Sequence, residues 1–202
     1  MILVGRYVSP FARRTAVVLQ LMGIDYEHGE LSTAQHGAEI RGFNPVGRVP
    51  ALELDDGDVL IDSGAIIDYL NEIAPSGRQV IPASGLERRQ VLKLTAIGHA
   101  AAEKVVALFY ERTRRPQEKV FEDWAHALEN QIQGGLDALD HAAEGRDWLV
   151  GDALTLADIT AVCAYDAVRL IAPALTDGHP YPHLTALAAR CNAMPAFAET
   201  AP

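Results

Sequence analysis

The stretch SPFARR, residues 9–14, combines a serine, a proline and two arginines at the start of an expected helix. Serine before proline is a common way to begin a helix, because the hydroxyl accepts from an unpaired N–H group and proline lacks one. The positive end of the helix dipole favours acidic side chains, yet the first turn contains Arg13 and Arg14. Such a start favours an external anion, for example a thiolate, whose pKa falls there. Residues 1–74 contain no cysteine, so the thiol would arrive on a ligand.

A second candidate feature is the Val49–Pro50 bond in the stretch NPVGRVPALEL, residues 44–54. This bond follows a turn and stands at the start of an expected strand, where an X-Pro bond can be cis. A cis bond would expose the backbone of the preceding valine for pairing with an extended peptide. The pattern therefore indicates a position for an extended ligand backbone.

A third candidate feature is the pair Asp62 and Ser63 in LIDSGAI, residues 60–66, at another helix start. The serine hydroxyl and the neighbouring N–H groups suit a carboxylate, and the aspartate suits an ammonium group. A plain structural interpretation also exists, because a serine at this position can simply cap the helix. The three features together predict positions for a thiolate, an extended backbone and the head of an α-amino acid.

The elements that would position these residues alternate between strand and helix. Apolar runs, helical spacing and turn residues predict the order βαβαββα, with strands at 1–5, 24–31, 49–54 and 59–62 and helices at 10–22, 34–43 and 63–73. Residues 75–85, rich in proline, glycine and serine, predict a linker. Strand signals end beyond it, and residues 86–202 are expected to form an all-helical domain, with helices at 86–114, 117–143, 156–172 and 183–192.

Composition narrows the classes of function. A chain of 202 residues with 49% apolar content can bury a sizeable core. A net charge of −10, with no basic run longer than two residues, argues against a nucleic-acid partner. The short apolar start and the lack of an 18-residue apolar run predict a cytoplasmic chain with no membrane partner. Cys163 and Cys191 form no CxxC pair, so we expect reduced thiols and no metal site.

One motif of the helical half has a structural interpretation. In LTLADI, residues 154–159, Thr155 stands three residues before Asp158. This is the spacing of a capping box, in which each side chain bonds to the backbone N–H of the other residue. We expect the pair to begin a buried helix and to take no part in chemistry.

The order βαβαββα, the stretches SPFARRTAVVL, NPVGRVPALEL and LIDSGAIIDYL, and the later LTLADI resemble the cytosolic glutathione transferase family over residues 2–197. The resemblance implies a thioredoxin-like α/β N-terminal domain at 1–74, an all-α C-terminal domain, a homodimer, and glutathione as co-substrate. It also implies that Pro50 is cis and that the Val49 backbone pairs with the cysteinyl unit of glutathione. Asp62 and Ser63 match the pair that holds the γ-glutamyl group, and Arg48 matches a position near the glycyl carboxylate.

Two residues compete for the role of activating the glutathione thiol. Ser9 matches the serine of the SPF pattern in serine-type members of the family, and its hydroxyl would donate a hydrogen bond to the thiolate. Tyr7 is the alternative, because tyrosine-type members place their residue slightly earlier. Since a serine stands where the related CPF pattern has cysteine, a mixed disulfide with glutathione cannot form at this position. Arg13 would either reinforce the positive site or brace the domain interface through a carboxylate.

Three functions fit these residues. The first is a glutathione transferase that activates the thiolate for attack on a small, apolar electrophile. The second is a transferase-like protein that binds a protein partner, as stringent-starvation-type proteins of similar architecture do. The third is a glutathione-dependent isomerase or dehalogenase, which would share the glutathione site and differ in the second substrate.

Overall fold

The computed structural model describes residues 1–202, and its internal contacts divide the chain into two units. Unit 1 comprises Met1–Val80 and Asn192–Pro202, and unit 2 comprises Ile81–Cys191. The domain limits predicted from the sequence stay a prediction. No helix is long and apolar enough to cross a membrane.

Unit 1 is built on a four-stranded mixed sheet in the order β2-β1-β3-β4. The strands are β1 (Ile2–Val4), β2 (Glu27–Gly29), β3 (Ala51–Glu53) and β4 (Val59–Ile61). β1 pairs parallel with β2 and antiparallel with β3, which pairs antiparallel with β4. The predicted order βαβαββα and the thioredoxin-like class are therefore confirmed. The strand expected at 24–31 is limited to three residues, because 24–26 connect it to the preceding helix.

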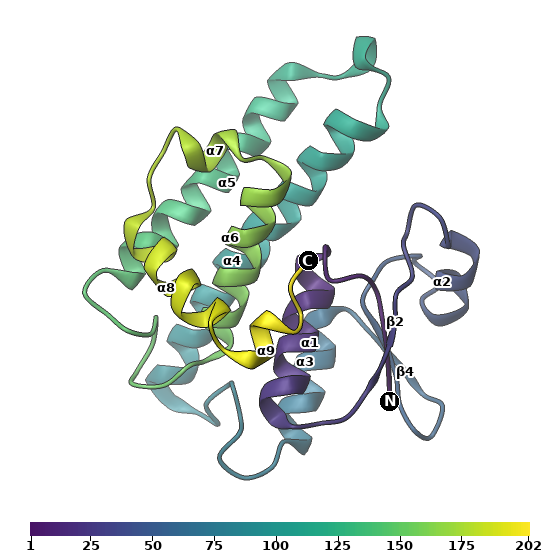
Figure 1. The fold of residues 1–202 in the computed structure, drawn as a ribbon, viewed down its shortest axis with the longest axis vertical. Helices are drawn as coiled ribbons and strands as arrows, with labels where there is room; N and C mark the ends of the chain where they lie inside the picture. Colours follow the sequence, from purple (N-terminus) through teal and green to yellow (C-terminus); the bar gives the residue numbers. More distant parts are fainter. The chain divides into compact units, whose positions relative to one another are not determined.

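Three helices accompany this sheet: α1 (Pro10–Met22), α2 (Gly37–Phe43) and α3 (Ser63–Ile73). α1 begins at the N-cap Ser9 and ends at Gly23, whose left-handed φ of 67° suits a residue without a side chain. Figure 1 shows α1 and α3 side by side against the sheet, and every residue from Pro10 to Leu19 is buried. Both arginines at the start of this helix are therefore buried.

The prediction that Ser63 caps α3 is wrong. The N-cap is Asp62, whose Oδ1 accepts a hydrogen bond from the N–H of Gly64 at 2.8 Å. Ser63 is the first helical residue instead. The φ of Asp62 is 69°, outside the helical region, which agrees with its position just before the first helical residue.

The last residues of the chain return to unit 1. α9 (Pro195–Ala198) packs against α1, and the fully buried Thr200 follows it. Arg13 fixes this segment, because its Nε donates to the carbonyl oxygen of Thr200 at 3.1 Å and its Nη2 donates to Oδ1 of Asn192 at 2.8 Å. The C-terminal segment is thus part of the packing of α1.

Unit 2 is helical, as predicted. Its helices are α4 (Gly85–Arg114), the 3-10 turn η1 (Gln117–Lys119), α5 (Glu122–Ala143), α6 (Leu156–Ile171), α7 (Ala174–Asp177) and α8 (Pro182–Asn192), the last residue of which is assigned to unit 1. α4 packs against both α5 and α6. A Cβ atom at Gly98 would lie 3.2 Å from the Thr160 side chain, so glycine permits the close approach of α4 and α6.

The helix expected at 117–143 begins later than predicted. Residues 117–119 form only a 3-10 turn, and α5 starts at Glu122. The buried carboxylate of Glu111 on α4 accepts from the N–H of Phe121 at 3.0 Å, just before α5 begins. A contact from another helix therefore sets the start, and the local sequence does not show it.

The capping box at the start of α6 is confirmed. Oδ2 of the buried Asp158 accepts from the N–H and the hydroxyl of Thr155 at 2.8 and 2.9 Å, and Oδ1 accepts from the N–H of Leu149 at 2.7 Å. Burial raises the pKa of the Asp158 carboxyl, and these hydrogen bonds oppose that rise. The aspartate thus ties the loop before α6 to the helix.

Candidate functional site

Ser9 lies where β1 runs into α1. Its Oγ accepts from the N–H of Ala12 at 3.4 Å, which is long for a hydrogen bond of this kind. The side chain is only partly buried. A hydroxyl that accepts one bond still carries a hydrogen that it can donate. Ser9 is thus both a helix cap and an available donor at the positive end of α1.

The loop that contains Val49 lies against this same helix start. Gly5 has a φ of 134°, and a Cβ atom there would lie 2.9 Å from Cβ of Val49 and 3.2 Å from Cβ of Ala12. The end of β1 therefore needs glycine, because two neighbouring segments approach it closely. The Val49–Pro50 bond is cis, as the sequence resemblance implied.

A buried asparagine that the sequence analysis missed shapes this loop. Asn44 Nδ2 donates to the carbonyl oxygen of Arg48 at 2.9 Å, and its Oδ1 accepts from the N–H of Val46 at 2.9 Å. The sequence did contain a signal for these contacts. An asparagine is the first residue of the NPVG turn, and asparagine side chains commonly bond to the backbone two residues on. Asn44 therefore determines the backbone course that leads to Val49.

Asp62 and Ser63 make contacts in different directions. Asp62 is exposed and bonds locally to the N–H of Gly64. Ser63 is buried, and its Oγ accepts from both Nε and Nη2 of Arg14, at 3.0 and 2.7 Å. The pair thus presents an exposed carboxylate beside a hydroxyl that a guanidinium group holds.

The two arginines of the first turn make contacts within the chain. Arg13 is 2% exposed and bonds to the C-terminal segment, and Arg14 is 3% exposed and bonds to Ser63. Of the two roles considered for Arg13, these hydrogen bonds correspond to bracing. They brace a segment of unit 1, and the acceptors of these two bonds are the carbonyl oxygen of Thr200 and the amide oxygen of Asn192.

Tyr7 is directed away from the start of α1. Its hydroxyl is hydrogen-bonded to the hydroxyl of Tyr26 at 2.9 Å, and its ring stacks on that of His28 at a centroid distance of 3.9 Å. It lines a shallow hollow of about 310 Å³ with Gln20 and Gly23, which stand at the opposite end of α1 from Ser9. Burial raises the pKa of the Tyr7 hydroxyl, and the bond to Tyr26 adds to the rise. This geometry favours Ser9 over Tyr7.

Comparison with known proteins supports the resemblance seen in the sequence. The model of the glutathione S-transferase N-terminal domain matches residues 3–79, and that of the C-terminal domain matches residues 100–195. The chain is 32% identical to the uncharacterized GST-like protein YibF of Escherichia coli, over 99% of this chain and 98% of that protein. It is 31% identical to a probable maleylacetoacetate isomerase of Vibrio cholerae, over 100% of this chain and 95% of that protein.

This chain belongs to the glutathione S-transferase family. Among solved structures, the transferase resembles a glutathione S-transferase of Methylobacterium radiotolerans in complex with glutathione sulfonate, with a TM-score of 0.94 and 26% identity, over 100% of this chain and 94% of that one. It also resembles one of Methylobacillus flagellatus with glutathione bound, with a TM-score of 0.93 and 29% identity, over 100% and 98% of the two chains. The predicted family, enzyme class and two-domain fold are confirmed.

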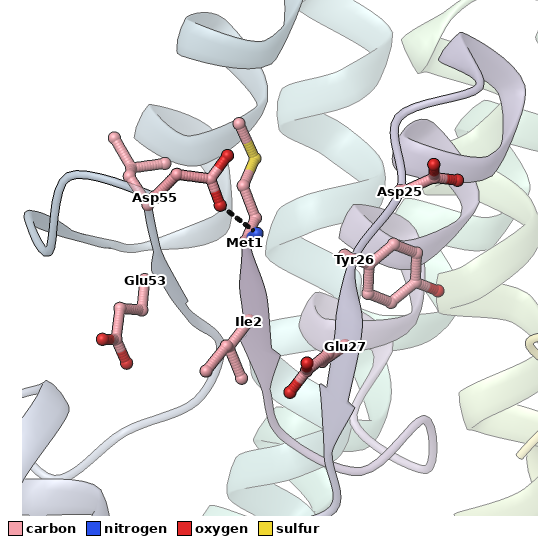
Figure 2. Close-up of a pocket in the computed structure, with 8 residues that line it drawn as sticks. Met1, Ile2, Asp25, Tyr26, Glu27, Glu53 and Asp55 are labelled. Carbon is pink, nitrogen blue, oxygen red and sulfur yellow. Dashed lines mark hydrogen bonds and ion pairs between the residues drawn. The ribbon is translucent and has the colours of Figure 1, made fainter.

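The transferase has a second hollow in unit 1, of about 460 Å³, at the N-terminal end of β1, which is the end away from Ser9 (Figure 2). It is lined by Met1, Ile2, Asp25, Tyr26, Glu27, Glu53, Leu54 and Asp55. The terminal amine of Met1 bonds to Oδ1 of Asp55 at 2.6 Å. The four carboxylates disfavour an anionic ligand. None of the residues predicted to bind glutathione lies there, so this hollow is separate from the candidate site.

Proposed function

We propose that this transferase binds glutathione at the C-terminal end of β1 and activates its thiol with the hydroxyl of Ser9. The observation that carries the proposal is the position of Ser9, a partly exposed donor at the start of a buried helix, beside the loop of Val49. The positive end of α1 and the hydroxyl would both stabilise the thiolate relative to the thiol. The relatives crystallised with glutathione or glutathione sulfonate support the choice of ligand.

The remaining predicted residues would then hold the rest of the tripeptide. The backbone of Val49, followed by the cis Pro50, would pair with the cysteinyl unit. Asp62 and Ser63 would take the ammonium and carboxylate of the γ-glutamyl group. The exposed Arg48 would lie near the glycyl carboxylate. The thiolate would attack a small, apolar electrophile.

The proposal extends to the organisation of the molecule. Residues 1–74 would form the glutathione-binding domain, joined by residues 75–85 to a helical domain at 86–202. The family supports a homodimer, which sedimentation equilibrium would detect as twice the chain mass of 21.8 kDa. A monomer at micromolar concentration would contradict it.

A titration of the bound thiol tests the role of Ser9. We expect ultraviolet absorbance of the thiolate to show a pKa about one to two units below the ordinary value of about 8.5 when glutathione is bound. Ser9→Ala should return this pKa toward 8.5 and lower kcat/KM by about 10²-fold to 10³-fold, because one donor to the developing charge is lost. Ser84→Ala is the matched control, since Ser84 is the N-cap serine of α4 in unit 2.

Two results would contradict the proposal. If glutathione binds with an undepressed thiol pKa, Ser9 is a helix cap without a role in activation. If the protein does not bind glutathione and is not retained on immobilised glutathione, the function is that of a protein-binding module, the second candidate from the sequence.

A second candidate activity is glutathione-dependent isomerisation. It is favoured by the relatives named as maleylacetoacetate isomerases, at 31% and 29% identity, and as a maleylpyruvate isomerase, at 30% identity. Conjugation consumes one glutathione per turnover, whereas isomerisation through a returning nucleophile consumes none. Product formation from a cis-enedioic keto acid without loss of free thiol would assign isomerisation, and thiol loss with an aryl halide would assign conjugation.

A further inference from the structure

The contact between Arg14 and Ser63 joins two helices that both contribute to the candidate site. Arg14 belongs to the first turns of α1 and Ser63 to the first turn of α3, 49 residues later in the chain. Nε and Nη2 of the arginine donate to the same serine oxygen, at 3.0 and 2.7 Å. Both residues are buried, with 3% and 2% of their surface exposed. The bond is therefore shielded from water.

This contact determines what the serine hydroxyl can do. A hydroxyl oxygen has two lone pairs and one hydrogen, and the two guanidinium N–H groups occupy both lone pairs. Arginine keeps its protons at every pH at which proteins fold, so it cannot become an acceptor for this hydroxyl. Ser63 is left with one function, donation of its own hydrogen, for which the structure gives no acceptor within the chain.

The acceptor that fits this hydroxyl is an anion. A cation bonded to a hydroxyl oxygen withdraws electron density from it and makes the O–H a stronger donor, and hydrogen bonds to carboxylates are shorter and stronger than neutral ones. The exposed carboxylate of the neighbouring Asp62 would repel that same anion but would attract an ammonium group. The pair therefore suits the two charged groups of an α-amino acid: Ser63 suits the carboxylate and Asp62 suits the ammonium group.

We propose that Arg14 is a positioning residue that holds the Ser63 hydroxyl as an obligate donor to the α-carboxylate of the γ-glutamyl group. The inference rests on the proposed binding of glutathione. Arg14 thus takes part in the recognition of the γ-glutamyl group, at a distance from the thiol that Ser9 contacts.

The test compares glutathione with the analogue that lacks only this carboxylate, γ-aminobutyryl-cysteinyl-glycine. Calorimetry would give the dissociation constant of each ligand for the wild type and for Arg14→Met, Ser63→Ala and the double variant. We expect the wild type to prefer glutathione by about tenfold or more. Each single variant should lose most of this preference while it binds the analogue as the wild type does. The double variant should lose no more than the single variants, because the two residues act as one unit.

Arg13→Met is the matched control. This neighbouring arginine is equally buried but bonds to the C-terminal segment. Its loss should lower the melting temperature and leave the ratio of the two dissociation constants unchanged. Should Arg14→Met not fold, Arg14→Lys replaces it, since lysine keeps the charge and loses the forked pair of donors. The lysine variant should also lower the preference for glutathione.

The outcomes separate this inference from the proposed function. If the wild type binds neither ligand, both are wrong. If the wild type prefers glutathione but the Arg14 variants weaken both ligands by the same factor, Arg14 only supports the fold and the positioning role is wrong. The same conclusion follows if the Arg14 variants keep the full preference for glutathione.

Discussion

Hydrogen-bond partners distinguish side chains that stand close together near the start of α1. Ser9 and Tyr7 are both candidates for the activating hydroxyl, because both lie between β1 and the first turn of α1. In the structure the tyrosine hydroxyl is bonded to Tyr26, whereas the serine makes one long bond to the backbone. The arginines of the same turn differ as well, since each bonds to a different segment of the chain. Sequence spacing alone could not separate these roles.

Substitution of Tyr7 tests this distinction. We expect Tyr7→Phe to keep kcat/KM for glutathione conjugation within about twofold of the wild type, because its hydroxyl is directed away from Ser9. Stability should fall by about 1 kcal/mol, the typical value of one hydrogen bond. Tyr26→Phe is the control, and the double variant should lose no more stability than either single variant. A loss of activity of about 10²-fold would instead identify Tyr7 as the activating residue.

The helices and strands show which parts of the fold local sequence determines. The bounds of α1 and α3 were predicted to the residue, because an apolar stripe marks each of them, although the capping side chain was predicted correctly only for α1. The starts of α2 and α5 were placed too early. The contact of Glu111 with the segment before α5 bridges ten residues, and that of Arg14 with Ser63 bridges 49. Contacts of that kind leave no local signal.

The start of α6 gives a prediction at the scale of the element. Asp158→Ala should lower the free energy of unfolding by about 3 kcal/mol, because three buried donors lose their acceptor. Asp152→Ala, at an exposed position of the preceding loop, is the control and should change it by less than about 0.5 kcal/mol. Urea denaturation measures both. An equal effect of the two substitutions would show that Asp158 does not stabilise the start of α6.

The raised pKa of Asp158 adds a dependence on pH to this prediction. The folded chain binds the proton of this carboxyl more tightly than the unfolded chain, because burial disfavours the charge. The contribution of Asp158 to stability is therefore complete below the unfolded pKa of about 3.9 and falls as pH rises through the folded pKa. The difference between the wild type and Asp158→Ala should be largest at acidic pH.

The whole molecule combines a family fold, which the sequence predicted, with a candidate site whose contacts the sequence showed only in part. The three stretches that carry the resemblance correspond to the start of α1, the loop before β3 and the start of α3. Ser9, Val49 and Asp62 could be named as candidates because each stands at a recognisable turn or cap, and their roles toward glutathione stay a prediction. The contacts of Asn44 with Arg48 and of Arg14 with Ser63 were missed, since they form only in the folded chain. The residues that would bind the second substrate were not predicted, because no residue pattern identified them.

Glutathione should stabilise the whole chain in a manner that depends on pH. A ligand that binds only the folded state raises stability by RT ln(1 + [L]/Kd), about 2.7 kcal/mol at a hundredfold excess over Kd. If Ser9 and the start of α1 lower the thiol pKa, binding releases a proton, and affinity rises with pH between the bound pKa and the free value of about 8.5. The slope should approach about tenfold per pH unit. The melting temperature at fixed glutathione should therefore rise over this window, relative to the ligand-free protein.

S-methylglutathione separates the thiolate from the rest of the tripeptide. It has no thiol proton to release, so its stabilisation of the wild type should not change over the same pH window. It should also stabilise Ser9→Ala as much as the wild type, because the Val49 loop and the start of α3 are unchanged in that variant. Glutathione should then stabilise Ser9→Ala with little dependence on pH. If the pH dependence with glutathione persists in Ser9→Ala, the positive end of α1 alone lowers the thiol pKa, and the serine is only its cap.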